Sequence, residues 1–228
     1  MSEGFEKYGF PEEKRYNSFV GYFKRKYGER LQKIVLDAGF TCPNRDGKVG
    51  RGGCTYCDNA AFHPSYSTSG KSLHQQLDEG IEFHKVRYRT TEHYLAYFQS
   101  HTNTYAPVAE LRSKYYAALN DTRIEGIVIA TRPDCLGEDV LDLLEEINRD
   151  HYMWVELGLQ STHNDTLKAM NTCYTYEDYE KAASSLISRG IRVVTHLILG
   201  LPGETQDMML ESVRKVCSLP VFGMKLHL

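Results

Sequence analysis

The sequence predicts an α/β fold in which six parallel strands form a partial (β/α)6 TIM-like barrel. Two features of the chain indicate this fold. Six short apolar runs alternate with helical patterns, and polar or thiol groups follow the first five of these runs. Strands separated by single helices pair in parallel through right-handed crossovers, which gives either a barrel-like sheet or a doubly wound one. The barrel is favoured, because it gathers the strand ends around one central cavity.

The strands are expected where short apolar runs are bounded by polar and glycine-containing segments. The six predicted strands span residues 32–36, 94–99, 126–130, 153–160, 193–199 and 221–228. The segments that follow the first five strands carry the candidate functional groups: Cys42, residues 99–103, residues 131–134, residues 160–161 and residues 200–204. Parallel strands bring all of these segments to one rim, which is where barrel enzymes place their chemistry.

The predicted helices between the strands carry apolar faces and capping signals. The clearest runs from Glu138 to about Arg149 and repeats apolar residues at helical spacing. Another begins after Thr175, whose hydroxyl can cap the helix together with Asp178. Gly190 supplies the left-handed residue that ends this second helix. No repeat or linker divides the chain, so residues 31–228 are expected to form one core barrel.

Three cysteines follow the first predicted strand. Cys54 and Cys57 are close enough in sequence for both sulfurs to face one metal site. The loop that leads back to Cys42 is rich in glycine, which permits the close backbone approach that wrapping a cluster requires. Three thiolates can hold three corners of an iron–sulfur cube and leave the fourth iron open to a ligand. A cluster is therefore favoured, and a zinc site lacking one ligand or a disulfide with a leftover thiol are the alternatives.

The other three cysteines are scattered singly along the chain. We expect Cys135, Cys173 and Cys217 to be small buried apolar side chains or tolerated surface thiols.

Composition is typical of a soluble cytoplasmic enzyme. The chain has 228 residues, of which 41% are hydrophobic and 25% are charged, so it can bury the core of one large domain. No apolar run approaches the ~20 residues needed to cross a bilayer, and the polar N-terminus does not resemble a signal peptide. We therefore expect no membrane partner. The net charge of −3 gives no general attraction to nucleic acid, so RNA binding would require a local patch.

Residues 1–30 are expected to form a basic and aromatic extension ahead of the barrel. Two interpretations of this extension are compatible with each other. An amphipathic helix on the barrel surface is favoured, because aromatic residues at helical spacing usually pack. Basic side chains with aromatic faces would also suit single-stranded RNA. The residues concerned are Lys14, Arg15, Lys24, Arg25, Lys26 and Arg30 with Tyr16, Phe19, Tyr22, Phe23 and Tyr27.

The last predicted strand would leave an unpaired edge on an inner barrel strand. We therefore expect the barrel to be truncated at its C-terminal end, with part of the substrate site beyond residue 228.

Taken together, these motifs resemble the radical S-adenosylmethionine (SAM) enzymes, and within them the subgroup similar to the catalytic subunit of the Elongator complex. The resemblance extends over nearly the whole chain from about residue 30. It rests on the cysteine triplet with Tyr56 before the last cysteine, and on the runs 131–134, 155–161 and 196–204. The gap between Cys42 and Cys54 is wider than in the commonest family pattern, and Elongator-like members also have a widened gap. The resemblance implies a partial barrel of the radical SAM type.

The resemblance also implies two cofactors. A [4Fe–4S] cluster would be held by Cys42, Cys54 and Cys57, and SAM would bind its open iron and be cleaved reductively to a 5'-deoxyadenosyl radical. The protein would exclude water and aim the radical. Residues that match the SAM-contact motifs are Tyr56 and Ile198 near the adenine, Glu156 and Gln160 toward the ribose or methionine part, Gly200 at a close backbone approach, and Gln99, Ser100 and Arg132 as weaker candidates.

Two of these candidates have structural alternatives. Glu156 could instead be a buried, hydrogen-bonded structural carboxylate. Arg132 could form a loop ion pair with Asp134.

The cluster loop and the stretch 97–107 resemble bacterial members of the subgroup that are associated with wobble-uridine modification of tRNA. The resemblance implies tRNA as a partner, remodelling of a 5-carboxymethylaminomethyl side chain toward 5-aminomethyl, and a reducing electron donor such as flavodoxin or ferredoxin. A radical enzyme that acts on a small metabolite and a non-catalytic metal-binding scaffold are the alternatives. The charged residues of the cluster loop, Arg45, Asp46, Lys48 and Arg51, could touch the substrate or could be solvated at an exposed turn.

Overall fold

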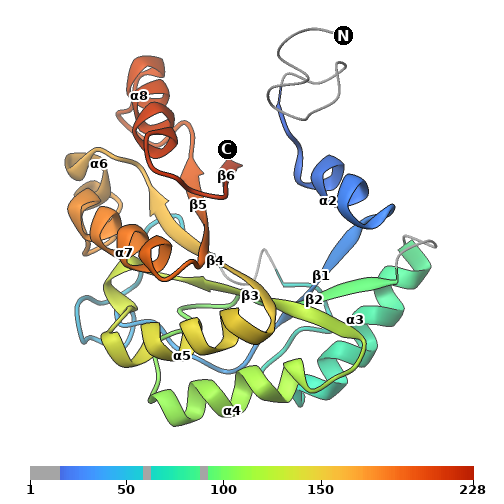
Figure 1. The fold of residues 1–228 in the computed structure, drawn as a ribbon. Helices are drawn as coiled ribbons and strands as arrows, with labels where there is room; N and C mark the ends of the chain where they lie inside the picture. The colour runs from blue at the N-terminus through green and yellow to red at the C-terminus, as the bar shows by residue number, and fades with distance from the viewer. Residues whose placement is uncertain (1–15, 59–62, 88–91) are drawn as a thin grey trace, which may run out of the picture.

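The computed structural model describes residues 16–58, 63–87 and 92–228, and it contains one parallel sheet of six strands. The strands pair in chain order from β1 to β6 and curl into a half-barrel (Figure 1). This order confirms the partial barrel and excludes the doubly wound alternative, in which the order of strands would reverse. The strands are β1 (Leu31–Leu36), β2 (His93–Phe98), β3 (Ile124–Thr131), β4 (Tyr152–Gln160), β5 (Arg192–Ile198) and β6 (Gly223–His227).

The outer face of the sheet is covered by helices that follow the strands (Figure 1). A large apolar core fills the space between this face and the helices, with residues such as Ile129, Val155 and Leu144 fully buried. The helices on this side are α3 (Leu73–Arg87), α4 (Val108–Leu119), α5 (Glu138–Asp150), α6 (Asn164–Ala169), α7 (Tyr176–Ser188) and α8 (Gln206–Cys217), and a short 3-10 turn, η2, spans Pro133–Cys135.

The two helices expected from the sequence form where their signals lie. In α5, the apolar face is buried along its length. Thr175 caps α7, and its hydroxyl and the Asp178 carboxylate satisfy each other's backbone N–H groups in a capping box. Gly190 adopts a φ of 72° directly after the helix, as a left-handed stop requires. Short-range sequence signals therefore determine both helices.

The helix α2 (Phe19–Tyr27) lies on the opposite side of the sheet from α3, α4 and α5 (Figure 1). Its Phe19 and Phe23 rings pack 5.6 Å and 6.1 Å from the Trp154 ring on the inner face of β4. Tyr22 contacts Phe222 just before β6. The helix therefore closes the half-barrel at the N-terminal ends of the strands.

This packing favours the amphipathic-helix interpretation for the described part of the N-terminal extension. The aromatic side chains of α2 serve as core packing, as the amphipathic interpretation expects. Lys24, Arg25 and Lys26 remain exposed on the helix, whereas Lys14 and Arg15 lie outside the described residues. No helix of the described chain combines the length and the apolar character that a membrane span needs.

Gly126 offers a test of the sheet packing. A Cβ at this position would overlap the carbonyl oxygen of Tyr152 on the neighbouring strand. We expect Gly126→Ala to lower the free energy of unfolding by about 1–3 kcal/mol, because two paired strands must move apart. The measurement is chemical denaturation followed by circular dichroism. Gly70→Ala is the matched control, since a Cβ there meets no atom within 4 Å, and an equal loss in both variants would contradict the packing argument.

Candidate functional site

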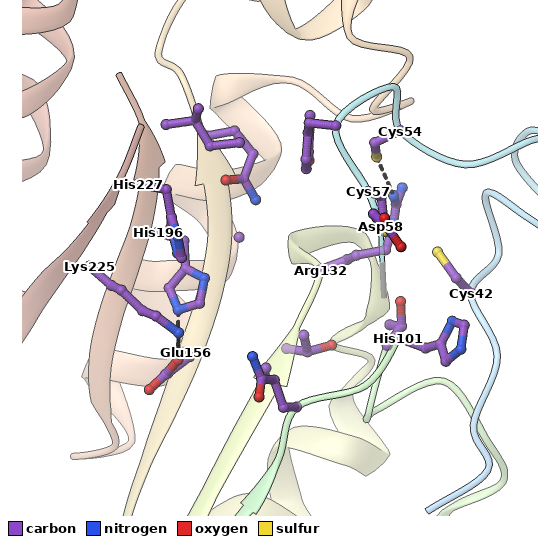
Figure 2. Close-up of a pocket in the computed structure, with 18 of the residues that line it drawn as sticks. Cys42, Cys54, Cys57, Asp58, His101, Arg132, Glu156, His196, Lys225 and His227 are labelled. Carbon is purple, nitrogen blue, oxygen red and sulfur yellow. Dashed lines mark hydrogen bonds and ion pairs between the residues drawn. The ribbon is translucent and has the colours of Figure 1, made fainter. Parts of the chain in front are cut away.

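A cavity of about 360 Å³ lies inside the curl of the sheet and reaches the segments that follow the strands. It is lined by side chains from β2 to β6 and from the cysteine loop. Figure 2 shows the cysteines and Arg132 on one side and Glu156, His196 and Lys225 on the other. The predicted site residues that line it are Cys42, Cys54, Cys57, Tyr56, Gln99, Arg132, Glu156, Gln160 and Ile198.

Two predicted residues do not line the cavity. Gly200 lies in the turn after β5 with a φ of 84°, and its N–H points to the sulfur of Met209 at 3.1 Å. Its glycine character is thus explained by the turn. Ser100 is buried and its hydroxyl bonds to Nε2 of His63 at 2.8 Å.

The cysteine loop is folded by its own turns. The Cys42 carbonyl accepts from the N–H groups of Arg45 and Asp46 at 2.8 Å and 3.1 Å. The N–H of Cys57 donates to the Cys54 carbonyl at 3.0 Å, so the second and third cysteines form one tight turn. All six cysteines of the chain are free thiols.

A buried amide fixes this loop to the connection between α6 and α7. Asn44 is fully buried, and its Nδ2 donates to the carbonyl of Asn171 at 2.5 Å and lies 3.5 Å from the sulfur of Cys54. Asn171 in turn donates to the carbonyl of Gly53 at 2.8 Å. A Cβ at Gly50 would overlap Asn44 Oδ1, so the loop requires glycine there. The position of Cys54 therefore depends on a segment more than 100 residues away in the chain.

Arg132 is held beside the cysteines by a partly buried ion pair. Its guanidinium donates two hydrogen bonds to Asp134 at 2.9 Å and 2.8 Å and a third to the Thr172 carbonyl at 2.8 Å. Nη1 lies 3.9 Å from the sulfur of Cys54. Burial alone would lower the pKa of Arg132, but the Asp134 carboxylate more than offsets it and the pKa is raised. The loop ion pair expected as the alternative is present, and it keeps a permanent positive charge next to a thiol.

These residues fit an iron–sulfur cluster better than a single ion. Among the described residues, no three His, Cys, Asp or Glu side chains converge closely enough to hold one metal ion. The thiols of Cys42, Cys54 and Cys57 instead border one cavity, as the corners of a larger inorganic group require. The guanidinium groups of Arg45 and Arg132 lie near them and would offset the negative charge of bound thiolates.

On the other side of the cavity, Glu156 contacts side chains from four other strands. Its Oε1 accepts from Lys33 of β1 at 2.6 Å, and its Oε2 accepts from Tyr97 of β2 at 2.6 Å. His196 of β5 contacts Oε2 at 2.7 Å, and Lys225 of β6 contacts it at 3.3 Å. The side chain is only 2% exposed. Glu156 therefore has the buried, hydrogen-bonded environment of the structural alternative, while it also lines the cavity.

The charges of this group follow from its contacts. Burial alone would raise the pKa of Glu156, but Lys33, His196 and Lys225 together hold that pKa well below its usual range. Burial lowers the pKa of His196 despite its contact with the carboxylate, and burial raises the pKa of Tyr97. Around neutral pH the Glu156 carboxylate is therefore charged, whereas the His196 imidazole and the Tyr97 phenol are neutral. Burial lowers the pKa of Lys225, although the Glu156 carboxylate acts in the opposite direction.

The end of β4 directs Gln160 into the cavity. The pairing with β5 shifts register between Gly158 and Gln160, and Gln160 adopts a φ of 75°. A Cβ at Gly158 would come within 2.9 Å of the Gln160 amide nitrogen. The absence of a side chain at Gly158 therefore leaves the space that Gln160 and the cavity share.

Sequence reasoning missed the partners of Glu156. Lys33 and Lys225 are charged residues inside otherwise apolar strands, and Tyr97 and His196 occupy inward positions on theirs. A lone charge in a buried strand implies an internal partner, and this signal could have paired both lysines with Glu156. Tyr174 and His227 also line the cavity and were not singled out, whereas His101 and Thr131 belong to the segments 99–103 and 131–134 that were expected at the rim.

Comparison with known proteins gives a family and several relatives. The family described as the Radical SAM superfamily matches residues 42–216. The chain is 43% identical over 222 residues to the uncharacterized protein YtqA of Bacillus subtilis, covering 95% of this chain and 67% of that protein. It is 40% identical over 216 residues to protein YhcC of Escherichia coli, covering 94% and 68%. The chain thus spans about two thirds of these relatives.

More distant matches include tRNA-modifying proteins and solved structures. A tRNA uridine(34) acetyltransferase of Methanocaldococcus jannaschii is 31% identical over 107 residues, which is 46% of this chain and 19% of that protein. The structure of archaeal Methanocaldococcus infernus Elp3 matches 86% of this chain and 45% of that chain with a TM-score of 0.58 at 19% identity. The methyltransferase TsrM from Kitasatospora setae, solved with a [4Fe–4S] cluster bound, matches 87% and 34% with a TM-score of 0.51 at 16% identity. These structures share the fold.

The buried Glu156 group gives a test with a pH signature. We expect Glu156→Gln to lower the free energy of unfolding by roughly 3–5 kcal/mol near neutral pH, because two partly buried ammonium groups lose their counter-charge. The folded-state pKa of Glu156 lies below its ordinary value of 4.5. The advantage of the wild type is therefore complete above pH 4.5 and shrinks as the pH falls further.

Denaturation of both proteins between pH 3 and pH 7 measures this advantage. Glu138→Gln is the control, since the Glu138 side chain is 83% exposed and its contact with Arg189 contributes little. A constant difference between wild type and Glu156→Gln across this pH range would contradict the assignment of the carboxylate as the titrating group.

Proposed function

The chain belongs to the radical SAM superfamily, and we propose that it uses a [4Fe–4S] cluster and SAM to modify the wobble uridine of tRNA. The reaction we propose remodels a 5-carboxymethylaminomethyl side chain toward 5-aminomethyl. One observation supports the radical chemistry most directly. Three free thiols border the same cavity as the SAM-contact candidates, which come from the cysteine loop and from several strands.

Cys42, Cys54 and Cys57 are the residues that would hold the cluster, and Tyr56, Gln99, Gln160 and Ile198 are available to bind SAM. When bound, these cofactors supply reductive cleavage of SAM to a 5'-deoxyadenosyl radical that can take hydrogen from an unactivated carbon. A reducing donor such as flavodoxin or ferredoxin would provide the electron.

The chain's own residues would bind and orient the cofactors, and they would exclude water from the cavity. Arg132 keeps its charge beside Cys54 because Asp134 holds its guanidinium in a fixed plane. Trp154 and the α2 aromatics close the end of the half-barrel at the N-terminal ends of the strands and exclude water there. The amide of Gln160 faces the cavity, and it could orient the ribose or methionine part of SAM through its donor and acceptor atoms.

Support for a tRNA substrate comes from the relatives and from the rim. Distant relatives are named as enzymes that act on uridine 34 of tRNA. Arg45 and Lys48 are exposed in the cysteine loop, where phosphates of a bound RNA could meet them. Arg45 lines the cavity, and Lys48 lines a second pocket beside Tyr105. The basic residues of α2 lie at the other end of the half-barrel, so we assign the RNA contact to the rim.

Anaerobic reconstitution tests the radical chemistry. The protein is supplied with iron, sulfide, SAM and dithionite, and the bound iron and the released 5'-deoxyadenosine are quantified. We expect about four irons per chain and SAM cleavage in the wild type, and loss of both in Cys57→Ala. Cys217→Ala is the control, since Cys217 is an exposed thiol on α8 and should change neither quantity. A colourless zinc protein without cleavage would refute the proposal.

The substrate is tested by adding tRNA to the active protein and analysing its nucleosides by mass spectrometry. We expect the 5-carboxymethylaminomethyl uridine to decrease and the 5-aminomethyl uridine to increase, in a SAM-dependent manner. SAM cleavage that leaves tRNA unchanged would refute the tRNA substrate and favour a small metabolite.

A further inference from the structure

The Glu156 group contains two lysines but only one carboxylate. Lys33 and Lys225 both contact Glu156, and the neighbouring His196 and Tyr97 are neutral. One carboxylate therefore faces two lysine side chains. Burial lowers the pKa of Lys225 and the shared Glu156 carboxylate offsets this only in part, so the charged form of Lys225 lacks a full counter-charge. A buried charge without a full counter-charge is costly, so the arrangement favours an anion in the cavity.

The two lysines differ in how they are held. Lys33 lies 2.6 Å from Oε1, its ammonium is within 6 Å of the rings of Tyr97, Phe19 and Trp154, and it does not line the cavity. Lys225 makes only long contacts of 3.3 Å to Glu156 and to the Tyr97 hydroxyl. Its side chain is 31% exposed and lines the cavity. An ammonium has three donors, so Lys225 can present one to a ligand.

The other charged residues of the cavity are placed differently. Arg132 is held on the cysteine side of the cavity by its bidentate pair with Asp134, and Arg45 donates to the Cys57 carbonyl at 3.0 Å. Asp58 lies next to the cysteines, across the cavity from Lys225 (Figure 2). An anion that enters the side of the cavity away from the cysteines would therefore meet Lys225.

We propose that the Lys225 ammonium binds a carboxylate of the substrate at the side of the cavity away from the cysteines. The inference rests on the proposed function, in which this group is the carboxylate of the 5-carboxymethylaminomethyl side chain. Lys225 would then select the substrate, because the 5-aminomethyl product lacks the anion. The carboxylate of SAM is the other anion that could bind Lys225, and the experiment distinguishes it from the substrate carboxylate.

The experiment compares two synthetic anticodon stem-loop RNAs that differ only at the wobble side chain. One carries the 5-carboxymethylaminomethyl group and the other carries its primary amide, which has the same shape without the charge. Affinities are measured by fluorescence anisotropy with the full chain, reconstituted anaerobically in the presence of SAM. We expect the wild type to bind the carboxylate RNA at least about tenfold more tightly, the value of one charge-assisted hydrogen bond.

Three variants test the assignment to Lys225. Lys225→Met should reduce the preference to about one, and it should fold, because Lys33 still pairs with Glu156. Lys225→Arg should keep most of the preference. Lys24→Met is the control, since this exposed lysine of α2 can affect the affinity for both RNAs but not their ratio. If Lys225→Met does not fold, Lys225→Gln replaces it with the same expectation.

The following results would overturn the inference. A wild type that binds both RNAs equally, or a Lys225→Met variant that keeps the preference, shows that no substrate carboxylate binds Lys225. A Lys225→Met variant that loses SAM affinity without RNA and keeps the RNA preference assigns the ammonium to SAM. If neither RNA binds while SAM is cleaved, the tRNA substrate of the proposed function is refuted as well. If the wobble nucleoside is converted but the protein shows no preference for the carboxylate RNA, only the role of Lys225 is refuted.

Discussion

The carboxylate of Glu156 is the constraint on which the interior of the half-barrel depends. The sheet has two edge strands, β1 and β6, which do not pair with each other. Lys33 from one edge and Lys225 from the other both contact this single carboxylate on β4. A buried ion pair adds little net stability compared with apolar packing, but losing one partner is costly. The group therefore specifies how far the sheet curls, and the curl determines the width of the cavity.

The inner face of β4 explains why a cavity exists above that group. Its inward residues, Trp154, Glu156, Gly158 and Gln160, follow one another at the two-residue period of a strand. Trp154 is fully buried against α2 and forms the floor, and Glu156 forms the charged layer above it. Gly158 has no side chain, so the third layer is empty space. The cavity therefore follows from the order of three inward residues on β4: the large Trp154, the charged Glu156 and then Gly158, which has no side chain.

Much of the fold could be predicted because its signals are local. All six strands and the helices α5 and α7 form close to their predicted positions, since apolar periodicity and the Thr175 cap act within a few residues. The cysteine loop was recognisable for the same reason. The pairing of Glu156 with Lys33 was not predicted, because the two lie 123 residues apart and meet only when the sheet curls.

Other features were ambiguous for physical reasons. The aromatic residues of α2 suit both base stacking and core packing, and only the position of the helix against Trp154 separates the two. Gly200 was expected at a close backbone approach to SAM, yet a positive φ in a turn requires glycine equally well. The roles of the SAM-contact candidates stay predictions.

The strained positions of the backbone gather at the same site. Four non-glycine residues of the described chain have positive φ, and His101 and Gln160 among them line the cavity. Asn171 bonds to the cysteine loop, and the thiol of Cys173 lies 3.3 Å from the Oδ1 of Asn44. Such conformations cost about 1–3 kcal/mol each and persist only where the surrounding contacts fix them. Here the surrounding contacts include the bonds that position Cys54. Contacts with the folded α/β core therefore help to shape the cysteine loop.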